Sequence, residues 1–551
     1  MMLFARWIKS GRPWIWLTGG AVSICLVAVL GLLLLIGWKG LAYFWPTPLY
    51  QWQTFDGKRI VGVIYQKDSI PVEHISDAFA SLPQPVLERG EVERLNIKIA
   101  NRELYPLDFI SVLEPQLSVP VLPKEWAVIE RTSGGDFFGK PVAYETVSGH
   151  YRSDIALHLQ HGIEFADTIR EEIERISEDE IGRTGWELSA LLQAKKKAEY
   201  NNRLNEGYLE QFERKKMALN ELIAESEAKL EQLHSRLEED TVIVEDMTGR
   251  YIRISMASVV DAWYPNNMTA MQKLVHWGGK VKQFLMDDPR EANSEGGVFP
   301  AIFGTVFLVM VMSVIVMPLG VMAAIYLHEY AKNNLITRLI RIAVINLAGV
   351  PSIVYGVFGL GFFVYTLGGT IDELFYSDRL PAPTFGTPGL LWSALTLALL
   401  TLPVVIVAAE EGLGRIPNSV RHGSMALGAT QFETLWRIVL PMASPAIITG
   451  MILAVARAAG EVAPLMLVGV AKLAPNLPVD ANYPYIHLER KFMHLGYHIY
   501  DIGFQSPNIE AARPLVYATS FLLVAVIIGL NLTAIHIRNN LREKYRVLEQ
   551  E

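Results

Sequence analysis

The 551-residue chain contains a single cysteine, Cys25, which lies inside an apolar run. One cysteine cannot build an intrachain disulfide framework or a zinc site made of several thiolates. Basic residues are also too few to make the chain positive, since 49 Lys and Arg stand against 57 Asp and Glu. A net charge of −8 has the wrong sign for a protein whose main partner is nucleic acid, so we expect no nucleic-acid partner.

Catalytic and metal-binding motifs are missing as well. His328-Glu329 is not followed by a second histidine at the spacing of a zinc protease. Residues 134–140 match the first seven positions of an ATP-binding phosphate loop, but Pro141 occupies the eighth position. Proline has neither the hydroxyl that would bind Mg²⁺ nor a backbone N–H. We therefore predict no metal site, no cofactor and no enzymatic activity for this chain alone.

Long apolar runs dominate what is present. Hydrophobic residues make up 51% of the chain and charged residues only 19%, which indicates a membrane protein. A helix needs about 20 apolar residues to cross the hydrocarbon. Runs of this length occupy residues 14–38, 298–327, 342–371, 380–409, 439–470 and 514–535. The first run is too long for a signal peptide and lacks a small-residue cleavage site, so we expect it to remain as a span.

The basic residues of the short segments predict the orientation of the spans. They concentrate on one side of the membrane, with Arg6, Lys9 and Arg12 before the first span and Arg338 and Arg341 before the third. The positive-inside rule then places both termini in the cytoplasm. We accordingly divide the chain into a cytoplasmic start with the first span (1–38), an inserted extracytoplasmic domain (39–297), a core of five spans (298–535) and a cytoplasmic tail (536–551).

The inserted domain shows two kinds of pattern. Turn signals and strand-like stretches, at 59–65 and 95–99 and again at 241–255, predict a β-rich unit. Between about residues 155 and 240, a 3-4 repeat of apolar residues predicts a helical hairpin or coiled coil. Its turn lies either near Gly182 and Gly185 or near 201–207. We favour a spacer held together by its own coil, and a docking or sensing surface is the alternative.

The loop between the fourth and fifth spans carries the signals of two short helices joined by a corner. Asn418 can cap the first helix, and Gly428 suits the left-handed conformation at its end. Thr430 and Glu433 form a capping box for the second helix, and Pro441 marks its end. Such a helix-turn-helix could bind DNA, but here the bilayer holds both ends and the protein is acidic. We predict a lever that docks another protein.

This corner resembles the loop of ATP-binding-cassette importer permeases, whose pattern is Glu-Ala-Ala, three residues, Gly, nine residues, Ile-x-Leu-Pro. Gly428 and Ile438-Val439-Leu440-Pro441 match that spacing, whereas His422-Gly423-Ser424 replaces the opening triplet. The resemblance implies that the loop 410–444 couples to an ATPase subunit, through Ala426, Leu427, Gly428, Ala429, Thr430, Glu433 and Pro441. Glu410 or Glu411 is a candidate to replace the glutamate that is missing at His422.

Two further motifs resemble those of phosphate importer permeases. One runs Arg457-Ala458-Ala459-Gly460-Glu461-Val462-Ala463-Pro464-Leu465, with Val462 where the family has threonine. The other, Leu-Ala-Gly-Val-Pro-Ser-Ile-Val-Tyr-Gly at 347–356, lies in the third span. The resemblance covers about residues 298–535. It implies an all-α polytopic membrane protein with six transmembrane helices of the importer permease type, and the inserted α+β extracytoplasmic domain with its coiled coil is added to that core.

Arg457 and Glu461 are four residues apart, so a helix would place them on one face. A charge at mid-bilayer costs about 2.5 to 3.5 kcal/mol on insertion scales, so the pair must face protein or water. The pair is either a structural ion pair or part of the substrate pathway. In the pathway, the guanidinium of Arg457 would bind an oxyanion, and Glu461 would keep that anion from binding too tightly to be released. The resemblance favours the pathway. Pro351, Ser352 and Tyr355 are further pathway candidates, with a packing kink as the alternative.

The resemblance implies the permease subunit of an importer that moves inorganic phosphate into the cell across the bacterial inner membrane. The implied partners are a second permease subunit of similar fold, ATP-binding subunits that hydrolyse ATP, a periplasmic phosphate-binding protein, phosphate itself and the lipid bilayer. Another oxyanion, sulfate or molybdate, is an alternative substrate. A membrane sensor with a coiled-coil ectodomain is the alternative from another class, and the short tail after the last span disfavours it.

Overall fold

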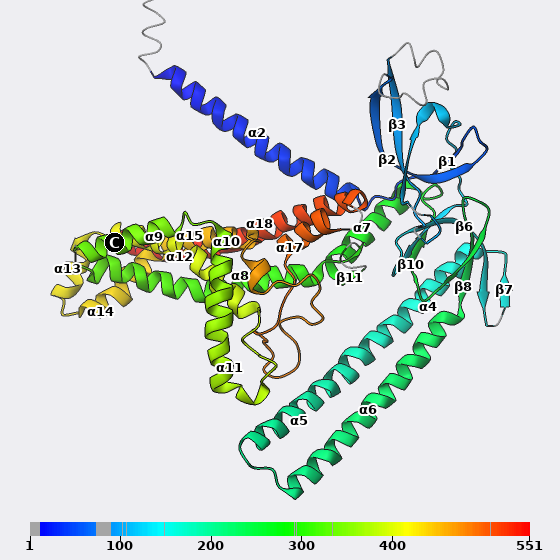
Figure 1. The fold of residues 1–551 in the computed structure, drawn as a ribbon. Coiled ribbons are helices and arrows are strands. Elements are labelled where there is room, and N and C mark those ends of the chain that lie inside the picture. The colour runs from blue at the N-terminus through cyan, green and yellow to red at the C-terminus, as the bar shows by residue number, and fades with distance from the viewer. Residues whose placement is uncertain are drawn as a thin grey trace, which may run out of the picture. The chain divides into compact units, whose positions relative to one another are not determined.

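The computed structural model describes residues 11–550, apart from 73–89, 102, 106, 148, 291, 292, 294, 333, 507 and 508 (Figure 1). The chain divides into two compact units. The membrane unit comprises Met1–Tyr43 and Phe284–Glu551, and the inserted unit comprises Phe44–Gln283. Arg6 and Lys9, on which the predicted orientation partly rests, lie outside the described residues.

Six helical segments in the described part of the chain are long and apolar enough to cross a membrane, which confirms the predicted number. They are α2 (Arg12–Ala42), α8 (Phe299–Ile325) continued by a π turn to Tyr330, α10 (Ser352–Phe358) continued through α11 (Gly369–Phe375), α12 (Leu390–Gly414), α14 (Gln431–Thr434) continued through α15 (Leu440–Gly460), and α18 (Ile509–Gln550). The apolar surface of α2 is exposed along its length, and α2 packs on α18 close to Gly40.

The predicted beginnings of the third and fourth spans are wrong, and proline is the reason in both places. A separate helix, α9 (Leu335–Leu347), ends before Pro351, which is extended and precedes the first residue of α10. The residue before a proline is driven away from the helical region, so one continuous span from 342 is not formed. Residues 380–389 contain three prolines, at 381, 383 and 388, and the fourth span begins only at Leu390.

The fifth span is one helical segment from Gln431 to Gly460, interrupted only by a π turn. Two predictions about it are wrong. The segment does not reach residue 470, because Glu461 is extended and Pro464 follows. Pro441 does not end the second loop helix either, since it lies at the beginning of α15, directly after the π turn, where a missing N–H is tolerated.

Helices α8, α12 and α15 form the core of the membrane unit. Buried apolar side chains from all three helices make one cluster, which includes Leu308, Met312, Val316, Leu397, Val405, Ala454 and Ala458. Small residues bring α12 and α15 close together, because a Cβ added at Gly412 or Gly450 would lie 2.6 Å from an alanine Cβ on the other helix. Close backbone approach through small residues is a general means of packing helices in membranes.

The inserted unit contains two antiparallel sheets, as the strand-like stretches predicted. The first has the order β1 (Tyr50–Gln53), β2 (Arg59–Pro71), β3 (Glu91–Lys98) and β4 (Phe109–Leu113). The second has the order β10 (Val259–Trp263), β5 (Ala127–Arg131), β6 (Phe137–Thr146), β8 (Thr241–Glu245) and β9 (Tyr251–Ser255), and β7 (Gly149–Tyr151) pairs with β6. The phosphate-loop-like segment is a turn followed by β6, whereas an ATP-binding loop opens a helix.

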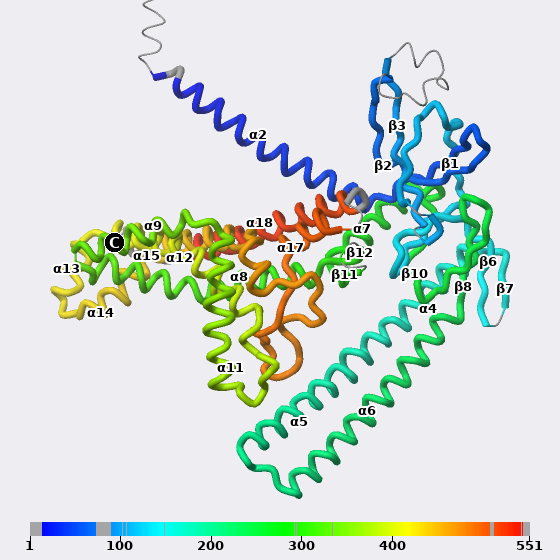
Figure 2. Tube along the Cα trace, viewed as in Figure 1, coloured from blue at the N-terminus to red at the C-terminus, as the bar shows by residue number. Residues whose placement is uncertain are grey.

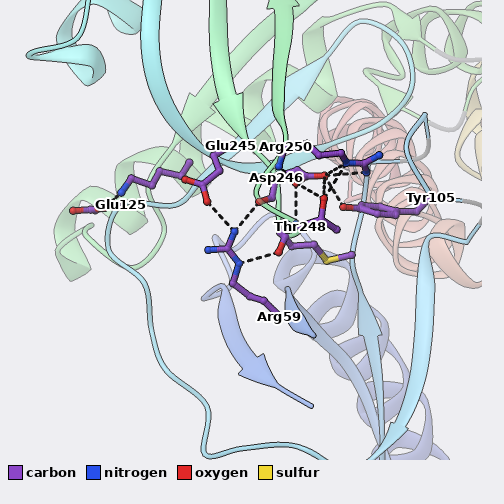
Figure 3. A network of polar contacts seen from close by, with 9 residues as sticks. Arg59, Tyr105, Glu125, Glu245, Asp246, Thr248 and Arg250 are labelled. Atoms are coloured by element: carbon purple, nitrogen blue, oxygen red, sulfur yellow. Dashed lines mark hydrogen bonds and ion pairs between the residues drawn. The ribbon is translucent and has the colours of Figure 1, made fainter. Parts of the chain in front are cut away.

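A polar network around Asp246 ties the two sheets together (Figure 3). Asp246 is fully buried and accepts hydrogen bonds from Thr248, Arg250 and the hydroxyl of Tyr105. Burial opposes its ionisation, but these hydrogen bonds outweigh burial and hold the pKa of Asp246 below its usual value. From the first sheet, Arg59 donates to the backbone carbonyls of residues 246 and 247. The network therefore fixes the β8–β9 turn on β2.

The helical part of the inserted unit is a hairpin (Figure 2). Its first arm comprises α4 (Ile155–Arg175), a π turn and α5 (Arg183–Tyr200), and α6 (Glu206–Glu239) packs against this arm. The turn lies at 201–205, the second of the two predicted positions, and the side chain of Asn205 caps α6. Gly182 lies in the π turn, which continues the arm instead of reversing it. The supercoiling of a true coiled coil stays a prediction.

Candidate functional site

Arg457 and Glu461, the charged residues of the apolar run at 439–470, lie together where α15 ends. Arg457 is in the last turn of α15, and Glu461 is the extended residue that follows it, so the two do not share a helix face as predicted. They are paired nevertheless, with 3.6 Å between Nε of Arg457 and Oε1 of Glu461. The side chains keep 33% and 22% of their surface exposed. Within the described residues, Arg457 has no second ion pair, so most of its guanidinium donors stay available.

The motif of the third span lies beside this pair. A Cβ added at Gly356 would lie 2.7 Å from Cα of Pro464, so α10 and the segment after Glu461 touch backbone to backbone. Tyr355 is buried, and Arg457 is close enough to act on it electrostatically. The structure thus brings together two motifs that are about a hundred residues apart in the chain.

The other residues of the third-span motif have different surroundings. The hydroxyl of Tyr355 donates to the carbonyl of Leu347 at 2.5 Å, which fastens the beginning of α10 to the end of α9. Pro351 is exposed and Ser352 is half-buried, and neither has a hydrogen bond to the Arg457–Glu461 pair among the contacts of the described residues. Of the three third-span candidates, only Tyr355 has an electrostatic interaction with Arg457 among the described residues.

Val462, which stands where the related motif has threonine, packs in another direction. A Cβ added at Gly496 would lie 2.5 Å from Cγ2 of Val462. Gly496 belongs to α17 (Leu495–Tyr500), a short helix between the fifth and sixth spans. The methyl group of Val462 therefore fills the contact between the segment after Glu461 and α17.

Sequence reasoning missed a buried polar cluster around α17. The histidine pair, His494 and His498, is 1% and 2% exposed, and both ring nitrogens of His498 lack a hydrogen-bond partner. Burial lowers the pKa of both histidines to about 4, so they are neutral at pH 7. Nearby, buried Asp501 pairs with Lys472 at 3.2 Å. Only the spacing of two histidines four residues apart, followed by an aspartate, could have signalled this cluster.

The loop between the fourth and fifth spans forms the predicted corner, which we call the elbow (residues 418–436). Its first helix is α13 (Asn418–Ala426), and Gly428 adopts the left-handed conformation with φ 92°. Thr430 and Glu433 form the predicted capping box, with Thr430 N donating to Glu433 at 3.0 Å and Glu433 N donating to Thr430 at 3.2 Å. The prediction that Asn418 caps α13 is wrong, because its side chain accepts from Arg421 instead.

Large apolar side chains project from the elbow. Leu427 is 91% exposed, next to exposed Ala426 and half-buried Ala429. Phe432 and Trp436 are 65% and 62% exposed, and their rings stack with centroids 6.4 Å apart. Sequence reasoning missed these two aromatics, although their spacing of four residues places them on one helix face. Exposed apolar groups gathered in this way mark a surface that binds another protein or a membrane.

A largely buried ion pair stabilises the elbow. Glu329, at the end of the second span, pairs with Arg421 of α13 at 3.0 Å, and the two side chains are 13% and 12% exposed. Arg421 also donates to the carbonyls of Leu413 and Ile416. Glu410 is held by Arg341 at 2.8 Å. The glutamate that reaches into the elbow is therefore Glu329, a residue that the sequence did not suggest.

The described residues contain no group of three or more His, Cys, Asp and Glu side chains that could hold a metal ion. The membrane unit thus has two features that bear on function. One is Arg457, which has a single ion pair among the described residues, beside a close contact between the third span and the segment after Glu461. The other is a braced corner that exposes large apolar side chains.

Comparison with known proteins finds similarity to transport permeases in the carboxy-terminal part of the chain. Residues 316–546 match the family described as binding-protein-dependent transport system inner membrane component. Phosphate transport system permease protein PstA 1 of Mycobacterium tuberculosis is 41% identical over 175 residues, which are 32% of this chain and 52% of that protein. The probable ABC transporter permease protein YqgI of Bacillus subtilis is 29% identical over 257 residues, which are 46% of this chain and 81% of that protein.

The phosphate transport system permease protein PstA of Haemophilus influenzae is 33% identical over 180 residues, which are 32% of this chain and 57% of that protein. The chain thus spans about half the length of the PstA proteins that it matches. Among solved structures, an inward-facing MetNI methionine ABC transporter aligns with 44% of this chain and 94% of that chain, at 17% identity and a TM-score of 0.33. At that TM-score the alignment adds nothing to the sequence matches.

Proposed function

Because the carboxy-terminal part of the chain is a PstA-like permease segment, we propose that the protein is the transmembrane permease subunit of an ATP-binding-cassette importer for inorganic phosphate. The observation that carries the proposal is the Arg457–Glu461 pair beside the contact between Gly356 and Pro464. The protein would work in the inner membrane with both termini in the cytoplasm. Its partners would be a second permease subunit of similar fold, ATP-binding subunits that hydrolyse ATP, and a periplasmic phosphate-binding protein.

Arg457 has the properties that a transient phosphate site requires. Its planar guanidinium offers several donors that match the oxygens of phosphate. Its bond to Glu461 is 3.6 Å long, well beyond the 2.7 to 2.9 Å typical of a strong charged hydrogen bond. An anion can therefore displace Glu461 without breaking a tight pair, and the carboxylate repels the anion afterwards. Tyr355 would position Arg457, while Pro351 and Ser352 would shape the beginning of α10.

The elbow would transmit the motion of the ATP-binding subunits. Leu427, Phe432 and Trp436 provide an exposed apolar surface for docking, and the turn at Gly428 with its capping box holds that surface in one geometry. The Glu329–Arg421 pair connects the elbow to the end of the second span. A push on the elbow would therefore move a membrane helix as well as the loop.

Phosphate uptake into proteoliposomes tests the proposal, with the chain assembled with its second permease and ATP-binding subunits. Arg457→Gln should lower uptake at least tenfold, because a charged hydrogen bond contributes about 1.5 to 3 kcal/mol and 1.4 kcal/mol is a factor of ten. Arg338→Gln is the matched control, since Arg338 is exposed, lies outside the loop 410–444 and has no ion pair among the described residues. Equal uptake by the two variants would refute the role of Arg457. Stimulation of ATP hydrolysis by sulfate or molybdate, and not by phosphate, would refute the substrate.

A further inference from the structure

The helix α7 (Ala270–Met286) leads from the inserted unit to the second span and carries an uncovered apolar stripe. Met271, Leu274, Val275 and Met286 are 67%, 50%, 64% and 63% exposed. Their spacing places them on one side of the helix, and Gly278 interrupts the stripe without adding a polar group. A run of four large apolar residues exposed on one helix is a surface that is covered by something in the working protein.

The opposite side of α7 is firmly attached to the inserted unit. Lys280 pairs with Glu130 at 2.5 Å and with Asp261 at 2.7 Å. The ring of His276 lies 4.6 Å from that of Trp263. Because these contacts hold the polar side of α7 against β5 and β10, the apolar stripe faces outward and cannot turn inward to cover itself.

Hydrogen bonds hold the segments on both sides of α7 in place. At its end, the carbonyl of Phe284 accepts from the backbone N–H of Val298, the residue that precedes α8, at 2.9 Å. Before its beginning, Asn266 exchanges hydrogen bonds with the backbone of Leu49, at 3.2 and 2.7 Å. Leu49 lies seven residues after Ala42, the last residue of the first span. The end of α7 is thus bonded directly to the residue before α8, and the second span begins soon after Met286 along the chain.

The composition of α7 suits a lipid surface. The helix has lysines but no Asp or Glu in its sequence AMQKLVHWGGKVKQFLM. Lys282, which is exposed, falls on the apolar stripe, where a long side chain can bury its methylene groups and extend its ammonium to a phosphate headgroup. We propose that α7 is an interfacial helix, whose stripe is buried in the headgroup region of the leaflet that faces the inserted unit.

Spin labels on the full-length protein in liposomes of anionic and zwitterionic phospholipid test this assignment. Cys25 is first replaced by serine, and single cysteines are then placed at Met271, Leu274 and Val275. Met217→Cys is the matched control, because Met217 is a methionine on helix α6 that is 73% exposed. Collision with oxygen, which concentrates in lipid, is compared with collision with a water-soluble nickel complex.

At the three stripe positions we expect the ratio of oxygen to nickel accessibility to exceed that of Met217 several-fold. A ratio equal to that of Met217 at all three positions would overturn the proposal, because the stripe would then face water. Low accessibility to both reagents would overturn it as well, since a protein surface would then cover α7. The test does not depend on phosphate transport, so its failure would leave the proposed function standing.

Discussion

Replacing Gly356 by alanine should separate the third span from the segment that follows Glu461. The added Cβ would lie 2.7 Å from Cα of Pro464 and 3.1 Å from its carbonyl oxygen, while ordinary contacts begin at 3.4 Å. The two backbones must therefore move apart by about 0.7 Å, the difference between 3.4 and 2.7 Å. Neither backbone can rotate out of the way as a flexible side chain would. Overpacking of this kind costs about 1 to 3 kcal/mol.

The matched control is Gly361→Ala, because Gly361 lies in the same span and a Cβ there would meet nothing within 4 Å. We expect Gly356→Ala to lower the apparent melting temperature of the purified protein by several degrees, since 1 kcal/mol corresponds to about 2 to 4 °C for a large domain. Phosphate uptake should fall as well, because Tyr355 moves away from Arg457. Gly361→Ala should leave both quantities near those of the unmodified protein. Indistinguishable melting temperatures and uptake for the two variants would refute the backbone contact.

Two further predictions concern groups that the membrane unit buries. Burial lowers the pKa of the histidine pair from 6.5 to about 4, so stability should be intact above pH 6.5 and fall as the pH decreases toward 4, by about 2 kcal/mol per histidine at pH 5. The melting temperature should depend less on pH between 7.5 and 5 in His498→Phe than in the control His422→Phe, whose histidine is exposed. An equal dependence on pH in the two variants would contradict the burial of His498. Glu329→Gln leaves Arg421, which is 12% exposed, without its carboxylate partner and should cost about 3 kcal/mol. ATP-binding subunits should then be lost on co-purification, whereas exposed Glu373→Gln should retain them.

Local patterns were enough to predict the classes of structure in this protein. The number of spans follows from the length of apolar runs, the strands follow from turn signals and strand-like stretches, and the helical hairpin follows from a 3-4 repeat of apolar residues. The corner at Gly428 with its Thr430 and Glu433 capping box was predicted correctly, because left-handed glycines and capping boxes depend on residues within one turn of each other. These features need no information from distant parts of the chain.

The boundaries of the spans were predicted less well, because apolar composition alone ignores backbone geometry. Residues 342–350 and 380–389 are apolar enough for a membrane, but the prolines at 351, 381, 383 and 388 determine where the helices begin. Residues 461–470 are apolar too, yet the chain leaves the helix at Glu461. Since hydropathy averages over a window, it cannot register a single residue that changes the backbone.

The sequence by itself determined that the chain has six runs apolar enough to span a membrane, that its inserted part is α+β, and that Arg457 and Glu461 interrupt the apolar run at 439–470. The tertiary structure alone decided which groups meet: Gly356 with Pro464, Glu329 with Arg421, and Asp501 with Lys472. Each of these pairs is separated by tens of residues or more. Contacts of this range depend on how complete helices pack, and packing is a property of side-chain shape in three dimensions that no local pattern encodes.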